Sequence, residues 1–153
     1  MMDKVQAARA PIHLWIVGLL ALTWNAFGCY DYIMTRMRNL DYLRAMAPDS
    51  DPEAMLAWSD GFPIYAQFGW GLGVWMGLAG SILLLMRHRW AVPAFALSLL
   101  GAVLGLGYQI IAAPPPPPPM DAGAMAFMPW VIILIAAGLY YYAHRQKQAG
   151  VLG

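Results

Sequence analysis

Four long and nearly uncharged stretches constrain this chain more than any other feature of its sequence. They cover about residues 12–34, 62–86, 90–113 and 122–145. The hydrocarbon core of a bilayer is about 30 Å thick, and a helix needs roughly 20 apolar residues to cross it. Each stretch is close to that length or longer. The sequence therefore predicts an all-α integral membrane protein in which four transmembrane helices form a bundle.

The composition supports this fold class. The chain is 61% hydrophobic and 11% charged, whereas soluble domains carry about 25% charged residues. Four spans and their connections use up the length, so we expect one membrane domain over residues 1–153. The first stretch is too long for a signal peptide, and we expect it to be retained. The sequence has no basic face of the kind that binds nucleic acid. The partner that we expect is the lipid bilayer.

The distribution of basic residues predicts the orientation. If the N-terminus is cytoplasmic, six of the nine Lys and Arg residues fall on the cytoplasmic side. The positive-inside rule favours that arrangement. Both termini are then cytoplasmic because the number of spans is even. The six residues are Lys4, Arg9, Arg87, Arg89, Arg145 and Lys147.

The connection at residues 35–61 predicts a short helical cap on the extracytoplasmic side. Apolar residues recur at every third position from Met37 to Met46. This spacing indicates one helical face, and we expect the first helix to continue outward through it. A second helix is then expected to start at Asp51 as its cap, with Pro52 in the first position.

The second outer connection, residues 114–121, begins with a run of prolines from Pro114 to Pro119. Such a run favours the extended polyproline II conformation, with a rise of about 3.1 Å per residue. We interpret it as a stiff spacer. The alternative is a docking segment for an aromatic groove.

A strip of small residues repeats at every fourth position of the second span. Repeats of this kind let membrane helices approach closely. They are consistent with packing inside the bundle and with contact between copies of the chain. The strip consists of Gly69, Gly73, Gly77 and Ser81.

Asn25 falls near the middle of the first span. Its amide must find a hydrogen-bond partner there, because hydrocarbon offers none. We therefore expect Asn25 to point into the bundle, with the indole of Trp75 as the favoured partner and Ser81 and Ser98 as weaker candidates.

Polar residues nearer the outer face of the spans are candidates for a solute path. Asp31 is ionisable, and such a group within a span is a candidate functional residue. The alternative is that Asp31 only pairs with Arg36 or Arg38 at the interface. The candidate polar layer consists of Asn25, Asp31, Gln67, Tyr108 and Gln109.

No residue pattern predicts catalysis, a cofactor or a metal site. His13, His88 and His144 are widely spaced and have no Cys or carboxylate partners at metal-ligand spacing. Phosphate-loop and nucleophile motifs are missing as well. We therefore expect a protein that is not an enzyme and holds neither cofactor nor metal.

Two segments give the chain a resemblance to a family. One is Trp24-Asn25-x-x-Gly28-x-x-Asp31-Tyr32-x-Met34-Thr35, and the other is Arg87-x-Arg89-Trp90-Ala91-x-Pro93 followed by Ser98-Leu99-Leu100-Gly101. Through them the chain resembles a group of small bacterial four-span proteins often labelled sugar transporters. The resemblance implies the bacterial inner membrane and supplies no catalytic residues. The proline run departs from the family pattern.

Two functions are consistent with these features. The favoured one is a non-enzymatic membrane protein that acts through helix–helix association, as an accessory subunit or a small homo-oligomer. The alternative is a small oligomeric transporter of a polar solute such as a sugar.

Overall fold

The computed structural model describes residues 8–153, and in this range the chain is all-helical. Lys4, one of the basic residues used to predict the orientation, lies outside the described residues. The helices are α1 (Ile12–Arg36), α2 (Leu40–Met46), α3 (Pro52–Asp60), α4 (Ile64–Leu85), α5 (Ala91–Ile111) and α6 (Gly123–Gln148).

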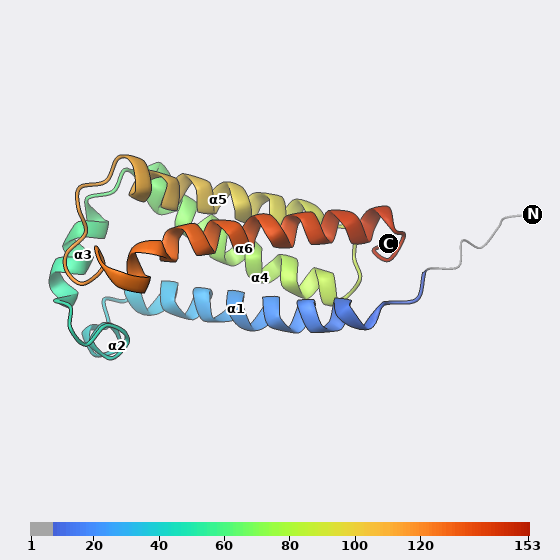
Figure 1. Ribbon diagram of the computed structural model, residues 1–153, viewed down its shortest axis with the longest axis horizontal. Helices are drawn as coiled ribbons and strands as arrows, with labels where there is room; N and C mark the ends of the chain where they lie inside the picture. The colour runs from blue at the N-terminus through green and yellow to red at the C-terminus, as the bar shows by residue number, and fades with distance from the viewer. Residues whose placement is uncertain (1–7) are drawn as a thin grey trace, which may run out of the picture.

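The four long helices α1, α4, α5 and α6 confirm the predicted fold class. Each is long and apolar enough to cross a membrane. They run along the long axis of the molecule (Figure 1), with α2 and α3 at one end. We call that end the cap end, and the opposite end, where α1 starts and α6 finishes, the terminal end. The protein is thus a four-helix membrane bundle with a helical cap.

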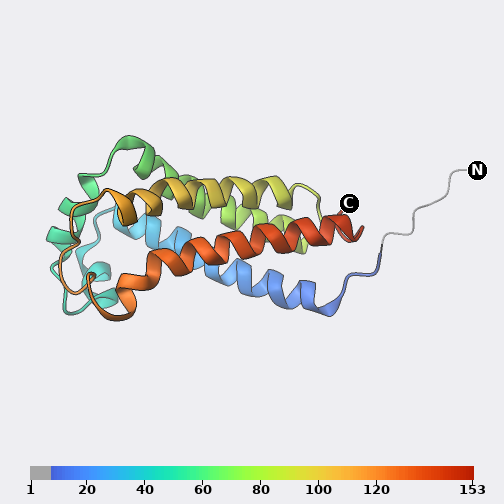
Figure 2. The same cartoon turned by 45° about the horizontal axis from the view of Figure 1, so that its top comes forward.

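The long helices pack in chain order. Helix α4 contacts both α1 and α5, and α6 packs against α5. Figure 2 shows the bundle from another side, with α6 (red) running alongside α5 (gold) and the start of α1 (blue) spread away below α6. Helix α6 is the least enclosed of the four, because only Pro129, Ala136 and Ala143 of its 26 residues are buried.

The terminal end holds the main hydrophobic cluster. Leu14 of α1, Leu84 of α4, Phe95 of α5 and Ala143 of α6 are all almost fully buried there. The last residues of the chain fold back onto the turn between α4 and α5, where the Arg89 N–H donates to the Gly153 carbonyl at 2.9 Å. Tyr142 of α6 also makes a hydrogen bond with His13 of α1. These contacts join α6 to α1, and the residues after α6 to the turn between α4 and α5.

Helix α1 ends at Arg36, so the expectation that it continues through Met46 is wrong. Arg38 has a positive φ of 56°. The N–H of Asn39 donates to the Met34 carbonyl, and that of Arg38 to the Thr35 carbonyl, both at 3.0 Å. This is the Schellman arrangement, which usually has Gly at the left-handed position. Because an arginine occupies it here, the sequence carries no visible stop signal.

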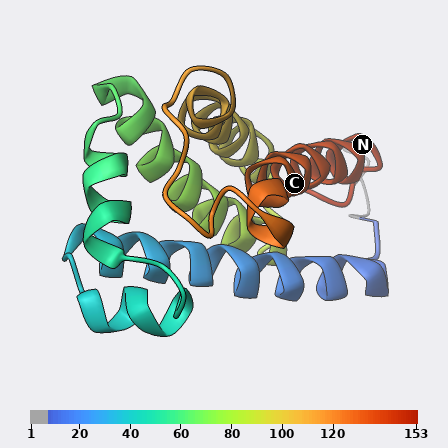
Figure 3. The same cartoon turned by 60° about the vertical axis from the view of Figure 1, so that its left-hand side comes forward.

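The side chain of Asn39 then starts α2 by accepting a hydrogen bond from the Tyr42 N–H at 3.0 Å. Helix α3 starts as predicted, with the Asp51 carboxylate accepting from the Glu53 N–H and Pro52 in the first position. Figure 3 shows α2 and α3, in cyan and green, beside the cap end of α1. The cap is therefore two short helices and not an extension of α1.

The connection from α5 to α6 contains the proline run, which has no regular secondary structure from Pro114 to Pro117 and turns from Pro118 onward. The indole N–H of Trp58 in α3 donates to the Pro114 carbonyl at 2.8 Å and ties this connection to the cap. Helix α6 starts at Gly123 and continues through Pro129, which lies inside it.

Candidate functional site

Asn25 faces the bundle interior, as predicted, and is only 9% exposed. Its amide Nδ2 donates to the Ala21 carbonyl of its own helix at 2.9 Å and to Ser81 Oγ of α4 at 3.1 Å. The Ser81 hydroxyl in turn donates a hydrogen bond to the Gly77 carbonyl at 2.8 Å. The donors of Asn25 and Ser81 are therefore all paired within and between α1 and α4. This pairing offsets the cost of burying them in an apolar layer.

The prediction that Trp75 is the hydrogen-bond partner of Asn25 is wrong. Its indole is 42% exposed and packs edge-to-face with Tyr32 at 6.5 Å between ring centroids. Positions two apart on a helix do not share a face. Trp75 is two residues before Gly77 and points away from Asn25, whereas Ser81 is four residues after Gly77 and lies on the same face.

The glycine strip lies inside the chain, between α4 and both of its neighbours. A Cβ added to Gly69 would lie 2.8 Å from the Gly101 carbonyl oxygen of α5. A Cβ on Gly77 would collide with the Asn25 amide oxygen and lie 3.1 Å from Ser98 Oγ. Ser98 Oγ in turn donates to the Gly73 carbonyl at 2.7 Å. The strip thus brings α5 close to α4 and makes room for Asn25.

Asp31 is held by the cap. The Tyr42 hydroxyl of α2 donates to Asp31 Oδ1 at 2.9 Å. Burial, and then the hydrogen bond to Asp31, raise the pKa of Tyr42 well above its ordinary value. Pairing of Asp31 with Arg36 or Arg38 is therefore wrong. This carboxylate joins α1 to α2.

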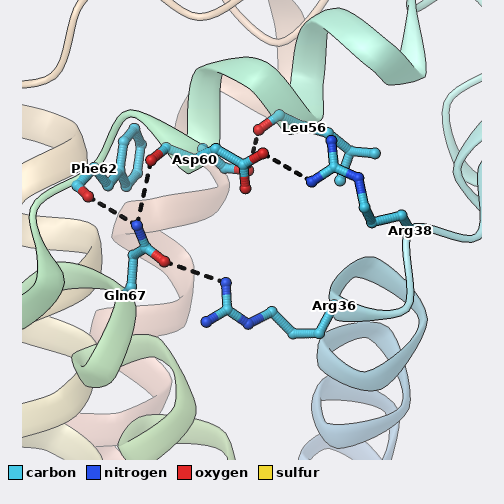
Figure 4. Close-up of polar contacts among 7 residues, drawn as sticks. Arg36, Arg38, Leu56, Asp60, Phe62 and Gln67 are labelled. Carbon is cyan, nitrogen blue, oxygen red and sulfur yellow. Dashed lines mark hydrogen bonds and ion pairs between the residues drawn. The ribbon is translucent and has the colours of Figure 1, made fainter.

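The remaining polar contacts of the cap end centre on Gln67, at the start of α4. Its amide Nε2 donates to the Phe62 carbonyl at 2.8 Å and to the Asp60 carbonyl at 3.3 Å. Its Oε1 accepts from Arg36 Nη1 at 3.3 Å (Figure 4). Arg38 makes an ion pair with Asp60 at 2.8 Å. These side chains bind α1, α3 and α4 together.

Two hollows adjoin this network. A small polar one of about 90 Å³ lies under α3 and is lined by Arg36, Arg38 and Asp60 among others. A larger one of about 470 Å³ is a groove between α1 and α4 whose lining includes Arg36, Gln67 and Trp75. Arg36 borders both.

The five residues of the predicted polar layer are placed in separate environments. Asn25 lies with Ser81, Asp31 with the cap, and Gln67 beside Arg36. Tyr108 packs edge-to-face on Phe62 and Tyr65. Gln109 has no side-chain hydrogen bond within residues 8–153. Of the five, only Gln67 lines either of the two hollows.

Sequence reasoning missed Tyr42 and underrated Ser81 and Arg36. Ser81 carried a signal, because it continues the four-residue repeat of the strip that faces α1 and α5. Tyr42 carried none, since its approach to Asp31 depends on the unmarked turn at Arg38. Among the described residues, no group of three or more His, Cys, Asp or Glu side chains is placed to hold a metal ion.

Comparison with known proteins adds no relative. No protein-family model matches the chain, and no match is found among curated proteins or solved structures. The resemblance to four-span proteins labelled sugar transporters therefore stays a prediction.

Proposed function

We propose that this chain is a bacterial inner-membrane protein, with both termini cytoplasmic, that acts without catalysis through association of its helices. It would serve as an accessory subunit or as a small homo-oligomer. The observation that carries the proposal is the exposure of α6. Phe127, Leu134 and Tyr141 lie on one side of it, and 68%, 69% and 63% of their surfaces are exposed.

The strip of small residues on α4, for which the sequence allowed packing inside the bundle or contact between copies, is not the proposed site of association. Gly69, Gly73, Gly77 and Ser81 are buried within the chain, so the strip offers no surface to a second molecule. Gly138 of α6 lies near the middle of the exposed side, and a Cβ there would meet nothing within 4 Å. Small residues on an otherwise bulky face allow another membrane helix to approach. Helix α6 is therefore the surface that we propose for association.

The test uses single cysteines in a Cys29→Ser background. Leu134→Cys places a thiol on the exposed side of α6, and Ile16→Cys on α1, where 54% of the side chain is exposed, is the matched control. We expect oxidation in native membranes to give a dimer, or an adduct of defined mass, with Leu134→Cys and not with Ile16→Cys. A monomer with both variants would refute association through α6.

The alternative function is transport of a small polar solute. Its structural support comes from Arg36, which lines both hollows at the cap end, and from Gln67, which lines the larger one. A carrier this short needs an oligomer, because most carriers are built from repeats of several spans. Proteoliposomes that swell in a sugar gradient, and lose this response with Gln67→Ala, would favour transport. A signal equal to that of empty vesicles would exclude it for that solute.

A further inference from the structure

The groove between α1 and α4 combines an apolar body with one charged end. Ile64, Phe68, Leu72 and Met76 of α4 line its length, and Arg36 and Gln67 lie at its cap end. Gly71 forms part of its floor, where the Tyr32 hydroxyl lies 3.0 Å from the position of an added Cβ. The hollow thus has the polarity of an amphiphile, with one cationic end and one hydrocarbon end.

The charge at that end is not neutralised by the protein. Arg38 pairs with Asp60 and Arg44 with Asp41, whereas Arg36 forms no ion pair within residues 8–153. Its contacts there are a long hydrogen bond to the neutral Gln67 at 3.3 Å and a position over the Tyr32 ring, 5.7 Å from the centroid. Guanidinium groups bind phosphate oxygens strongly and often through two hydrogen bonds. Arg36 therefore has hydrogen-bond donors available for an anion from outside the chain.

The depth of the groove fits one leaflet of a bilayer. Arg36 is the last residue of α1 and thus stands where that span leaves the membrane. From Ile64 to Met76 the groove follows α4 for about 18 Å at a rise of 1.5 Å per residue. Half of the hydrocarbon core is about 15 Å. An acyl chain in the groove would place its headgroup phosphate beside Arg36.

We propose that this groove is a binding site for a phospholipid with an anionic headgroup, in the leaflet at the cap end. The phosphate accepts hydrogen bonds from Arg36, and one acyl chain lies against Phe68, Leu72 and Trp75. The site is independent of the association proposed for α6, because no residue of α6 lines the groove.

The test measures lipid retention by the full-length protein. The protein is released from nanodiscs that contain phosphatidylglycerol and phosphatidylcholine in equal parts. The lipid that stays bound is identified and quantified by native mass spectrometry. We expect the wild type to retain phosphatidylglycerol preferentially. Arg36→Gln should reduce that preference by about fivefold, since an arginine near an anionic headgroup contributes roughly this much. Arg36→Lys should retain part of it.

Arg44→Gln is the matched control, because it removes a cap arginine away from the groove. Equal loss with Arg36→Gln and Arg44→Gln would mean general surface charge and overturn the site, as would no loss with Arg36→Gln. Dihexanoyl phosphatidylglycerol should bind more weakly than the long-chain lipid. Displacement of the lipid by millimolar inorganic phosphate would indicate a free-anion site instead. A disulfide-linked dimer of Phe68→Cys would show that a second copy fills the groove.

Discussion

Gly77 is the residue at which three helices meet. Its missing side chain leaves room for the Asn25 amide from α1 and for Ser98 from α5. Both of these residues are buried and hydrogen-bonded to α4. The same position therefore controls the approach of two neighbours, and a side chain there would have to displace the buried polar groups of Asn25 and Ser98.

Replacing Gly77 with Leu is expected to lower the free energy of unfolding by about 1–3 kcal/mol or more, the usual cost of overpacking a filled interior. Gly107→Leu is the matched control, because a Cβ there meets only Val103 Cγ1 of the same helix, at 3.9 Å. The measurement is unfolding in mild detergent with added denaturant. Equal stability of the two variants would contradict the close packing of α4.

The hydrogen bond between Asn25 and Ser81 should appear as a coupling energy. A double-mutant cycle of Asn25→Leu and Ser81→Ala is expected to give about 0.6 kcal/mol, and at most about 2 kcal/mol, as for other hydrogen bonds between membrane helices. Thr23 bonds within its own helix, so a cycle of Asn25→Leu with Thr23→Ala should give no coupling. Zero coupling in the first cycle would mean that the amide and hydroxyl do not interact.

The contribution of Tyr42 to the free energy of unfolding should fall at high pH. Its pKa is raised in the folded protein, so its proton is bound more tightly there than in the unfolded chain. The stabilisation is complete below the unfolded pKa of about 10 and is lost as pH rises through the higher folded value. We expect the difference in unfolding free energy between wild type and Tyr42→Phe to shrink above about pH 10. A difference that stays constant to higher pH would contradict the burial of this hydroxyl against Asp31.

At the scale of elements, helix ends decide where the cap stands. Helices α1 and α4 both end in Schellman turns with an arginine, Arg38 or Arg87, at positive φ. The turn after α1 redirects the chain into α2 and brings Tyr42 back onto Asp31. Each later contact of the cap depends on this reversal.

Substitutions at Arg38 test that turn. Valine is strongly disfavoured in the left-handed region, whereas glycine adopts it freely. Both changes remove the exposed ion pair with Asp60, which contributes at most about 1 kcal/mol. We therefore expect Arg38→Val to be less stable than Arg38→Gly by about 1–2 kcal/mol. Hydrogen exchange of α2 should rise in the valine variant alone; equal exchange in both would contradict the turn.

At the scale of the molecule, the bundle is closed at one end and looser along α6. The terminal cluster joins all four long helices, while α6 has α5 as its main neighbour along its length. The loop tie from Trp58 to Pro114 holds the cap end of this connection. Helix α6 thus lies outside the polar contacts that Asn25, Ser81 and Ser98 make between α1, α4 and α5.

The proposed orientation can be tested on this framework. In a Cys29→Ser background, His88→Cys lies in the turn between α4 and α5 at the terminal end, and Pro116→Cys lies in the loop at the cap end. We expect a membrane-impermeant maleimide to label Pro116→Cys in intact spheroplasts and His88→Cys only after lysis. The reverse pattern would invert the orientation.

The sequence by itself determined the span count, the approximate span boundaries and the start of α3. These features are local, because hydrophobic length and the Asp51-Pro52 cap act on the residues beside them. The inward direction of Asn25 followed in the same way, since a buried amide has no partner in lipid. None of these conclusions depends on which helices are neighbours in the bundle.

The tertiary structure alone decided which side chains form hydrogen bonds with each other. Ser81 bonds to Asn25 because α4 turns its glycine face toward α1, and Tyr42 bonds to Asp31 because the chain reverses at an arginine. The same packing buries the glycine strip inside the chain and leaves α6 exposed. Rotation of each helix about its axis sets these contacts, and an almost wholly apolar helix carries little sequence signal for that rotation.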